Sequence, residues 1–383
     1  LTGSGTLTKP AVSGSGGQTL NFNAIDNDFT GSIVIDNSNN QGITNVVGFN
    51  SLLDTASPGT GNLVIGGAAT NSTGYFTLNT GAIAPLILNN RQIELANVST
   101  TGGGGFSNLN TATGLGVTIN SNLLVSGPTG ARNLKLSSVA GPANVFAGTI
   151  SNGTSSPVGL IKEGTGSWSL TNANNAFTGP ILLNTTNSSA GTLAYASAGG
   201  ANAITFNQTT STATLSYIGT TNKEMSGPIT ASALTTGTIT LDSSGSGAVN
   251  YSNAASLGTA ASGNKNLILS GTSMGNNILA GGWNNNTGGA ATITKNGTGK
   301  WTLSGTNNYT GATTVNAGTL QFATMASLYN NTPANWTAAN INTKAGATFA
   351  VNLDSAGAAG FNSSNLNTLL TNISVAGTAA QGL

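Results

Sequence analysis

The sequence has 383 residues and contains no cysteine and no histidine. Without cysteine there is no disulfide, no iron–sulfur cluster and no thiol catalysis. Without histidine, catalysis by Ser–His or Cys–His pairs is excluded, and so is a histidine-based zinc site. These two absences remove most of the side chains on which enzymes depend for nucleophilic and metal chemistry.

Charged residues are also scarce. They make up 5% of the chain, whereas a typical globular protein has roughly 25%. The formal net charge of +1 gives no basic field that would attract nucleic acid. A weakly charged surface favours assembly, and Asn, Thr, Ser and the Gly backbone must keep this one hydrated.

Long apolar runs and helix signals are missing as well. No apolar run reaches the ~18 residues of a membrane-spanning helix, and no signal peptide precedes Leu1, which indicates a mature chain or a fragment. Only Met325 to Tyr329 and Leu366 to Leu370 could form a helical turn or two. The 55 Gly come with 9 Pro and 38% hydrophobic residues, which favours an ordered chain over a disordered one.

The residues that are present alternate between apolar and polar over short segments. Ile33 and Ile35 share one face, as do Trp301 and Leu303, and the cleanest run is Ala347 to Leu353. Successive side chains of a strand point to opposite faces, so these segments predict strands. Clusters of Gly and Asn between the segments predict turns.

A longer motif appears twice almost intact. One copy runs from Gly297 to Leu320 and the other from Gly164 to Leu183, and Trp301 follows Trp168 by 133 residues. A fainter copy near the start keeps the nine-residue spacing of Leu20 and Phe29. Recurrence of this kind predicts a repeat architecture. We place repeat units at residues 1–150, 151–285 and 286–383, the last incomplete, in one continuous rod.

Three repeat architectures fit short strands with regular turns: a sandwich array, a propeller or a solenoid. Asn recurs at equivalent places, at Asn174 and Asn175 and again at Asn307 and Asn308. Amide ladders between stacked strands favour the solenoid. With ~20–30 residues per coil it would have roughly 13–19 coils, and the strand spacing gives a rod of ~60–90 Å. A sandwich array remains the alternative.

The motif copies resemble the autotransporter-associated β-strand repeat of bacterial passenger proteins. The pattern is Gly-Thr-Gly-x-apolar-Thr-Leu-Ser-Gly, an aromatic residue before Thr-Gly, and then alternating Thr and Val. The second copy departs from it at Asn172, where Gly is expected, and by one residue added before Phe177. The matching positions are Gly164, Trp168, Leu170, Phe177, Gly179, Gly297, Trp301, Leu303, Tyr309, Gly311, Phe29 and Gly31. The resemblance implies an all-β, right-handed parallel β-helix outside the cell or on its surface.

Candidate catalytic groups are limited to the nine carboxylates. Asp36 and Asp54 are 18 residues apart, close to one coil, so they could stack as a facing pair such as a glycoside hydrolase needs. Stacked carboxylates repel each other, and we interpret both as solvated turn acids. Asp26 and Asp28 could contribute to a calcium site, but the EF-hand spacing and the calcium nonapeptide are absent. We therefore expect no catalytic, cofactor or metal site.

Several polar and aromatic features allow a binding role. Trp168 and Trp301 alternate with leucines and should point inward, whereas Trp283 and Trp336 do not and are better candidates for exposed sugar-stacking rings.

Gly102 to Gly105 is not a phosphate loop, because neither a Lys-Ser/Thr pair nor a βαβ unit accompanies it. Asn-x-Ser/Thr triplets follow from the composition and are weak evidence for glycosylation; they begin at Asn71, Asn97, Asn152 and Asn184, among others.

These observations predict a non-enzymatic extracellular structural protein: a surface stalk, adhesin or fibre subunit. Its partners would be copies of itself, joined end to end, and possibly a surface polysaccharide. No cap is evident at Leu1 to Lys9 or at Ser374 to Leu383, so the terminal coils should accept further strands. The alternatives are a polysaccharide lyase or hydrolase and an ice-binding solenoid, although Thr-x-Thr does not recur once per coil.

Overall fold

The structure is a computed structural model that describes residues 4–10, 18–24, 28–36, 44–52, 54, 60–66, 72–96, 103–127, 129–183, 191–260, 262–354 and 359–373. The chain forms two compact units. The first unit comprises Leu1–Thr185 and Ala190–Gly199, and the second comprises Thr186–Ser189 and Gly200–Leu383. Each unit is described by itself. The division into three sequence repeats stays a prediction.

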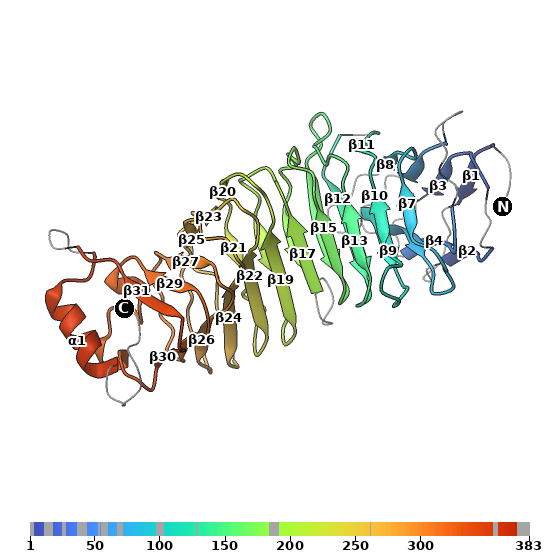
Figure 1. The fold of residues 1–383 in the computed structure, drawn as a ribbon. Helices are drawn as coiled ribbons and strands as arrows, with labels where there is room; N and C mark the ends of the chain where they lie inside the picture. The colour runs from blue at the N-terminus through green and yellow to red at the C-terminus, as the bar shows by residue number, and fades with distance from the viewer. Residues whose placement is uncertain are drawn as a thin grey trace. The chain divides into compact units, whose positions relative to one another are not determined.

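The first unit contains strands β1 to β17. Their bounds are β1 Leu7–Lys9, β2 Gln18–Phe22, β3 Ile33–Asp36, β4 Thr44–Phe49, β5 Leu63–Gly66, β6 Thr73–Leu78, β7 Leu86–Leu88, β8 Ile93–Leu95, β9 Gly103–Asn108, β10 Val117–Ile119, β11 Leu123–Val125, β12 Arg132–Ser138, β13 Ala143–Phe146, β14 Val158–Glu163, β15 Ser167–Leu170, β16 Ile181–Leu183 and β17 Gly191–Tyr195. They form three sheets in the orders β1-β3-β5-β8-β11, β2-β4-β6-β9-β12-β14-β16 and β7-β10-β13-β15-β17 (Figure 1). Neighbouring strands in these sheets run parallel.

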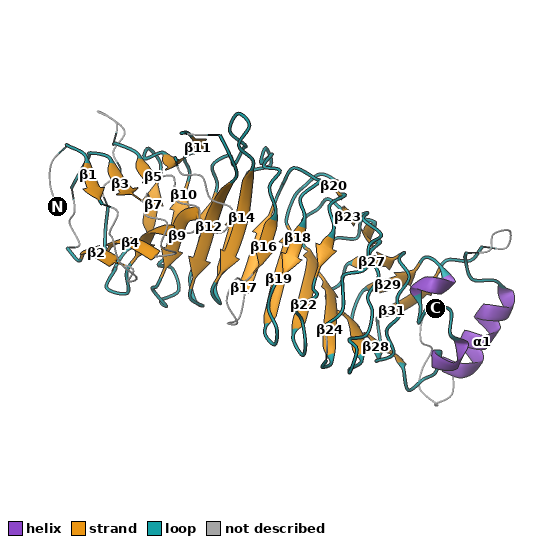
Figure 2. Cartoon of the chain, turned by 180° about the vertical axis from the view of Figure 1, so that it is seen from behind, coloured by secondary structure: helices purple, strands orange, loops and turns teal. Residues whose placement is uncertain are grey.

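The second unit repeats this arrangement with strands β18 to β31. Their bounds are β18 Ile204–Phe206, β19 Thr212–Tyr217, β20 Lys223–Met225, β21 Ile229–Thr230, β22 Thr238–Ser243, β23 Val249–Tyr251, β24 Lys265–Ser270, β25 Asn277–Leu279, β26 Ala291–Lys295, β27 Lys300–Leu303, β28 Thr313–Val315, β29 Thr319–Phe322, β30 Ile341–Thr343 and β31 Thr348–Val351. The sheet orders are β18-β21, β19-β22-β24-β26-β28-β30 and β20-β23-β25-β27-β29-β31 (Figure 2). Here too the neighbouring strands are parallel.

These parallel sheets make the chain an all-β solenoid of about 12 turns with almost no helix. The predicted fold class is therefore confirmed. The number of turns is slightly below the roughly 13–19 coils expected from a coil length of ~20–30 residues. Parallel strands need a crossover connection, and in a solenoid each coil supplies it by returning to the next rung of the same sheet. The handedness of the coil and the continuous rod stay predictions.

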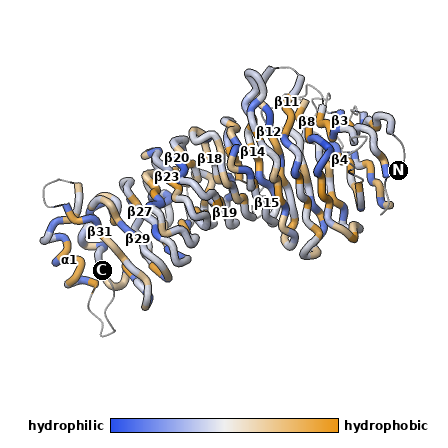
Figure 3. Tube along the Cα trace, turned by 45° about the horizontal axis from the view of Figure 1, so that its top comes forward, coloured by the Kyte–Doolittle hydropathy of each residue, from blue (hydrophilic) through white to orange (hydrophobic). Residues whose placement is uncertain are grey.

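The core consists of side chains that alternate inward along each strand. In β22, Ile239 and Leu241 are fully buried while Thr238 and Thr240 are half-buried. Figure 3 shows apolar and polar stretches alternating along the strands of both units. Each inward position stacks on its register partner one coil away, as Leu241 does on Leu269. Burial of such a side chain contributes about 1.5–3 kcal/mol.

An aromatic stack fills the core at the beginning of the first unit. The ring centroids of Phe22 and Phe49 are 5.6 Å apart, those of Phe49 and Phe76 are 6.4 Å apart, and those of Phe76 and Phe106 are 6.0 Å apart. Register between parallel strands places the first and last of these pairs over one another, because Phe22 pairs with Phe49 and Phe76 with Phe106. In the middle pair, Phe49 is in register with Leu78, and Phe76 lies two positions before it. Such pairs add about 0.5–1.5 kcal/mol beyond their buried area.

The alternation predicted from Ala347 to Leu353 holds only in part. Ala347 and Phe349 are buried, Val351 is half-buried and Leu353 is exposed. Strand β31 ends at Val351, and beyond its end the period-two geometry no longer applies.

The two helix signals differ in outcome. Met325–Ser327 forms the short 3-10 helix η1, as expected, and Pro333–Asn335 forms a second one, η2. The segment around Leu366 forms α1, Ser363–Ile373, an eleven-residue helix that is longer than the predicted one or two turns. Tertiary contact explains the extension, because isolated short helices are unstable in water.

Helix α1 follows the last strand of the second unit and precedes Ser374 to Leu383, the segment in which we saw no cap. It lies beside β30 and β31 in both views (Figures 1 and 2). Its Leu369 is fully buried, and the N–H of Ala338 donates to the carbonyl of Asn372 at 3.1 Å. Residues 374–383 lie outside the described residues. Within the described part of the second unit, the coil stack is therefore followed by a packed helix.

Candidate functional site

The tryptophans of the two motif copies are core residues. Trp168 lies in β15 and Trp301 in β27, and both are fully buried. Their indole N–H groups donate to the carbonyl of Ser137 at 3.0 Å and to that of Ser270 at 2.7 Å. Each ring therefore fills the interior and ties its coil to the backbone of the coil before it. The predicted inward direction is confirmed.

The other apolar motif residues are buried as well. They are Phe29, Leu170, Phe177, Leu303 and Tyr309. The hydroxyls of Tyr309 and Thr313 lie 2.7 Å apart, and the Tyr309 ring packs on Tyr329 with centroids 4.3 Å apart. Burial raises the pKa of Tyr309 well above its usual value. None of these side chains is placed to act on a solute.

The motif glycines stand where the coils approach most closely. Gly164 and Gly297 have φ of +71° and +70°, in the left-handed region that disfavours other residues. A Cβ on either would also overlap the backbone of the preceding coil. The same overlap would occur at Gly31, Gly179 and Gly311. All five glycines are therefore spacing elements.

Buried asparagines hold neighbouring coils together. The side-chain oxygen of Asn175 accepts the N–H of Ile150 at 2.8 Å, and that of Asn307 accepts the N–H of Trp283 at 2.7 Å. Sequence alone suggested ladders of like amides at these positions. The structure instead pairs each of these two amides with backbone of the preceding coil, which satisfies a buried N–H that would otherwise cost about 1–3 kcal/mol.

A second pair of asparagines extends the repeat beyond the recognised motif. Asn152 accepts the N–H groups of Val158 at 2.9 Å and Thr178 at 3.1 Å through its side-chain oxygen. Asn285, 133 residues later, makes two equivalent bonds with its own neighbours. Asn152 begins one of the predicted glycosylation triplets, and its role here is structural. The other three named triplets begin at Asn71, Asn97 and Asn184, and all three of these residues lie outside the described residues.

The prediction that Trp283 and Trp336 are exposed is wrong. Both side chains are fully buried. The indole of Trp283 donates to the carbonyl of Thr292 at 3.0 Å, and the ammonium of Lys265 lies 4.5 Å above its ring. Neither ring lies in a strand, so the period-two rule gave no information about the direction of either. No sugar-stacking platform exists at these two positions.

Two buried lysines are functional features of the repeat that sequence reasoning missed. Lys162 and Lys295 each stand two residues before a motif glycine and have almost no exposed surface. Lys162 donates to the carbonyls of Glu163 and Gly164 at 2.6 and 3.0 Å. Lys295 makes three bonds of the same kind, at 2.7, 2.7 and 3.2 Å. The signal in the sequence was the shared spacing Lys-x-Gly-Thr-Gly.

Burial shifts the protonation of these lysines. Desolvation lowers the pKa of Lys162 to about 7, against the opposing charge of Glu163. It lowers the pKa of Lys295 to about 8, against the charge of Asp242, and that of Lys265 to about 8. A neutral amine still donates to backbone carbonyls, so the turn remains bound in either state. Such shifts also mark catalytic groups, but these amines face carbonyls in the core.

Asp36 and Asp54, which we interpreted as solvated turn acids, have different partners in the structure. Asp36 pairs in register with Gly66. The carboxylate of Asp54 accepts the backbone N–H groups of Asn90 and Arg91 at 2.8 and 2.7 Å and the hydroxyl of Thr60 at 3.0 Å. The Asp54 carboxylate therefore stabilises the turn before β8 through hydrogen bonds and is not a solvated acid.

The calcium candidates give no site within the structure. Asp28 is exposed, and Asp26 lies outside the described residues. In the part of the chain that the structure describes, no three His, Cys, Asp or Glu side chains gather where they could hold a metal ion. Of the glycine run, Gly103 to Gly105 lie within strand β9 and Gly102 lies outside the described residues.

Threonine side chains form an irregular column on the outer face of the second unit. Thr214, Thr240, Ile268, Thr294 and Thr314 are successive register partners from β19 to β28. Isoleucine interrupts the hydroxyl row in the third coil. The column gives the ice-binding alternative no further support.

The remaining candidate is a shallow polar groove of about 500 Å³ in the second unit. It follows the ends of β23, β25 and β27, so three successive coils contribute to it. Its floor is made of small residues: Ala254, Ala280, Gly282 and Gly305. Its polar groups are Ser256, Asn284, Ser304, Thr306 and Asn308. We call this site the polar groove.

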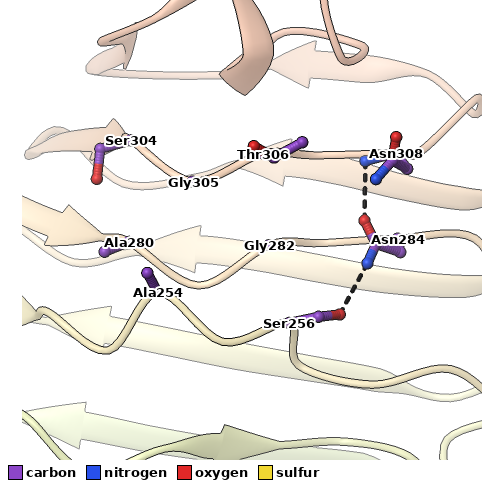
Figure 4. A pocket seen from close by; sticks show the side chains of 9 residues that line it. All are labelled: Ala254, Ser256, Ala280, Gly282, Asn284, Ser304, Gly305, Thr306 and Asn308. Atoms are coloured by element: carbon purple, nitrogen blue, oxygen red, sulfur yellow. Dashed lines mark hydrogen bonds between the residues drawn. The ribbon is translucent and has the colours of Figure 1, made fainter.

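Asn284 connects the three coils of the polar groove, as Figure 4 shows. Its side-chain oxygen accepts the N–H of Asn308 at 2.9 Å, and its side-chain nitrogen donates to the hydroxyl of Ser256 at 2.7 Å. A fixed amide at the centre keeps the spacing of the rows on both sides. This arrangement can bind a polar solute, but it offers no general acid, base or nucleophile.

Comparison with known proteins supports the reading of the motif. A family model described as Passenger-associated-transport-repeat matches residues 160–194 and 293–322, which contain both near-intact motif copies. No curated protein and no solved structure matches the chain. The repeat and the β-solenoid together fit an autotransporter passenger β-helix repeat protein. The passenger repeat implies secretion to the cell surface or the extracellular space.

None of the helices among the described residues is long and apolar enough to cross a membrane.

Substitution of a motif tryptophan should destabilise the protein. Trp301→Ala removes a fully buried ring and a hydrogen bond, so we expect a loss of about 3–5 kcal/mol in the free energy of unfolding. Thr298→Ala, at an exposed position on the turn before β27, is the matched control and should stay within about 0.5 kcal/mol. Denaturant unfolding followed by tryptophan fluorescence measures both. Equal midpoints for the two variants would contradict the core assignment.

The buried lysines should make stability rise with pH. The pKa of Lys162 is about 7 in the folded chain, below the usual 10.5, so the unfolded chain binds more protons between these values. Stability therefore increases with pH in this window, by ~3 kcal/mol for Lys162 between about pH 7 and 9.5. Unfolding curves recorded across this range should show the increase.

Lys162→Met should flatten that pH dependence, because it removes the titrating amine. Lys344→Met, at an exposed position, should retain it. If Lys162→Met does not fold, Lys295→Met provides the same comparison. A pH slope that is identical in the wild type and the buried-lysine variant would show that these amines do not control it.

Proposed function

We propose that this chain is a non-enzymatic passenger segment whose work is structural: a surface stalk, adhesin or fibre subunit outside the cell. The proposal rests on the observation that polar side chains of the repeat bind the backbone of the fold. Within the matched repeats, Lys162, Lys295, Asn175 and Asn307 all bind backbone groups. Side chains that would perform chemistry in an enzyme hold the coils together here.

The carboxylates follow the same pattern. Glu163 accepts the hydroxyl of Tyr75 and lies 3.6 Å from the ammonium of Lys135, which connects three strands of one sheet. Asp242 accepts hydroxyls of Ser216 at 2.6 Å and Ser244 at 2.8 Å. Glu94 and Glu224 likewise accept bonds from neighbouring coils. These four carboxylates therefore bind groups of the fold, which supports a structural role over the lyase or hydrolase alternative.

Axial extension is the second part of the proposal. Among the described residues, β1 and β2 have a strand partner on one side only, and β2 carries the first ring of the aromatic stack. The side chains of Leu20 and Phe22 are half-buried. An unpaired edge beside a partly covered apolar row accepts another strand. We propose that a further coil, from a second copy or from more of the same polypeptide, pairs there.

The absence of catalysis is directly measurable. Purified protein incubated with plant and bacterial polysaccharides, with calcium present, should produce no new reducing ends and no unsaturated sugars. A known β-helix lyase is the positive control. Activity that disappears in Asp28→Asn or Asp36→Asn would overturn the structural assignment.

Edge pairing should appear as concentration-dependent growth. Light scattering should give an apparent mass that increases with protein and salt concentration, since the weak net charge opposes association little. Thr8→Lys combined with Thr19→Lys places charge on the exposed side of β1 and β2 and should suppress the growth. Asn207→Lys combined with Thr298→Lys, at two exposed positions away from these strands in the sequence, is the charge-matched control. A wild type that stays monomeric at every concentration would contradict self-assembly.

A further inference from the structure

The polar groove of the second unit is built differently from the rest of the repeat. Its rim carries hydrogen-bonding groups that the fold itself does not use. We propose that the polar groove binds an uncharged, unbranched glycan that lies across the three coils. This proposal rests on the adhesin form of the proposed function and assigns it a site and a ligand class.

Three side chains of the polar groove have hydrogen-bonding capacity to spare. The amide of Asn308 and the hydroxyls of Ser304 and Thr306 have no hydrogen-bond partner within the described part of the chain. Asn308 and Thr306 are exposed, and Ser304 is half-buried. The neighbouring amides of Asn285 and Asn307, by contrast, are engaged by Thr310 and by the carbonyl of Ser327. The spare groups gather on one coil and face the same groove (Figure 4).

The chemistry of the lining selects the ligand. No lining residue is charged, so an anionic or cationic solute would lose hydration without gaining a partner. Amides and hydroxyls both donate and accept hydrogen bonds, as sugar hydroxyls do. The lining has no aromatic and no large aliphatic side chain, which disfavours an apolar ligand.

The repeat of the coils suits a chain of sugar rings. Parallel strands are ~4.8 Å apart, close to the length of one pyranose unit in an extended glycan. A glycan that runs across the coils therefore meets one polar row per ring: Ser256, then Asn284, then Asn308. Gly282 and Gly305 line the groove without a side chain that would stand between the polar rows.

A peptide strand is a poorer fit to the polar groove. The backbone around it is already paired between coils: Ala280 N–H donates to Tyr251 at 2.9 Å, Ser304 N–H to Leu279 at 3.0 Å, and Leu257 N–H to Gly282 at 3.0 Å. Strand addition requires free backbone donors and acceptors. A peptide would thus have to bind through side chains, without an apolar pocket to anchor it.

In the earlier motif copy, a side chain occupies a position that has none in the polar groove. Asn172 stands where the later copy has Gly305. The side-chain nitrogen of Asn172 donates to the carbonyl of Ala147 at 2.9 Å and covers the backbone there. At Gly305 a Cβ would overlap the carbonyl of Ala280, so this position carries no side chain that could cover the groove. The polar groove is a property of the second unit's copy of the motif.

Binding at a single groove should be weak, because the contacts are neutral hydrogen bonds without a stacking ring. Multiple copies on one surface would raise the effective affinity through multivalency. Weak single sites of this kind suit attachment to a long surface polysaccharide.

The test measures binding of the whole chain to immobilised neutral polysaccharides by biolayer interferometry. Cellulose oligomers, laminarin and dextran are the probes, and polygalacturonate is the charged comparator. The double variant Thr306→Ala/Asn308→Ala removes two spare groups and leaves the Asn284 bonds in place. Asn207→Ala/Thr298→Ala, at two exposed positions outside the groove, is the matched control.

We expect at least one neutral probe to bind the wild type and the control equally. The groove variant should bind it about tenfold more weakly, as the loss of two neutral hydrogen bonds implies. No binding to any neutral probe, equal binding of the groove variant, or equal binding of polygalacturonate would each overturn the proposal. The cleavage and assembly assays test the structural role separately, so that role would survive a negative result here.

Discussion

Stacking of parallel strands at one fixed spacing is the constraint on which the whole structure depends. Strands inside each sheet pair with the coil before them and the coil after them, so the backbones must approach to ~4.8 Å along each sheet. At the tightest points only glycine fits, and Gly164 and Gly297 also need a positive φ. Elsewhere the same spacing lets like side chains stack, which produces the phenylalanine row from Phe22 to Phe106. Short alternating strands can therefore build a large core without helices or disulfides.

Turns between these strands bring polar backbone into the interior, and the chain satisfies it with a small set of side chains. Lys162 and Lys295 bind turn carbonyls, and Asn175 and Asn307 bind N–H groups. An ammonium in this setting loses hydration, which is why the pKa of Lys162 falls to about 7. This cost explains why charged residues are scarce, because an ionisable group that faces a neighbouring coil needs its own partner there.

These roles leave little of the repeat for chemistry and direct attention to its surface. The match to the passenger-associated transport repeat covers the motif copies, whose buried lysines and asparagines are engaged in the fold. The polar groove around Asn284 differs because its spare groups lie outside the core. The core side chains of such a solenoid serve the same role in every coil, whereas the outward-facing side chains can differ from coil to coil. A structural protein would therefore acquire a ligand through its outward-facing side chains.

The sequence by itself determined the strands, the repeat and the inward direction of Trp168 and Trp301, because period-two alternation within a strand is a local property. It also predicted the solenoid, since the motif recurs. It did not determine the burial of Trp283 and Trp336 or the spare groups of Asn308, Thr306 and Ser304. Those positions follow strand ends, where local alternation stops, and the residues facing them come from coils about 20 to 28 positions away. Coil length varies, so only the tertiary register decides which side chains meet.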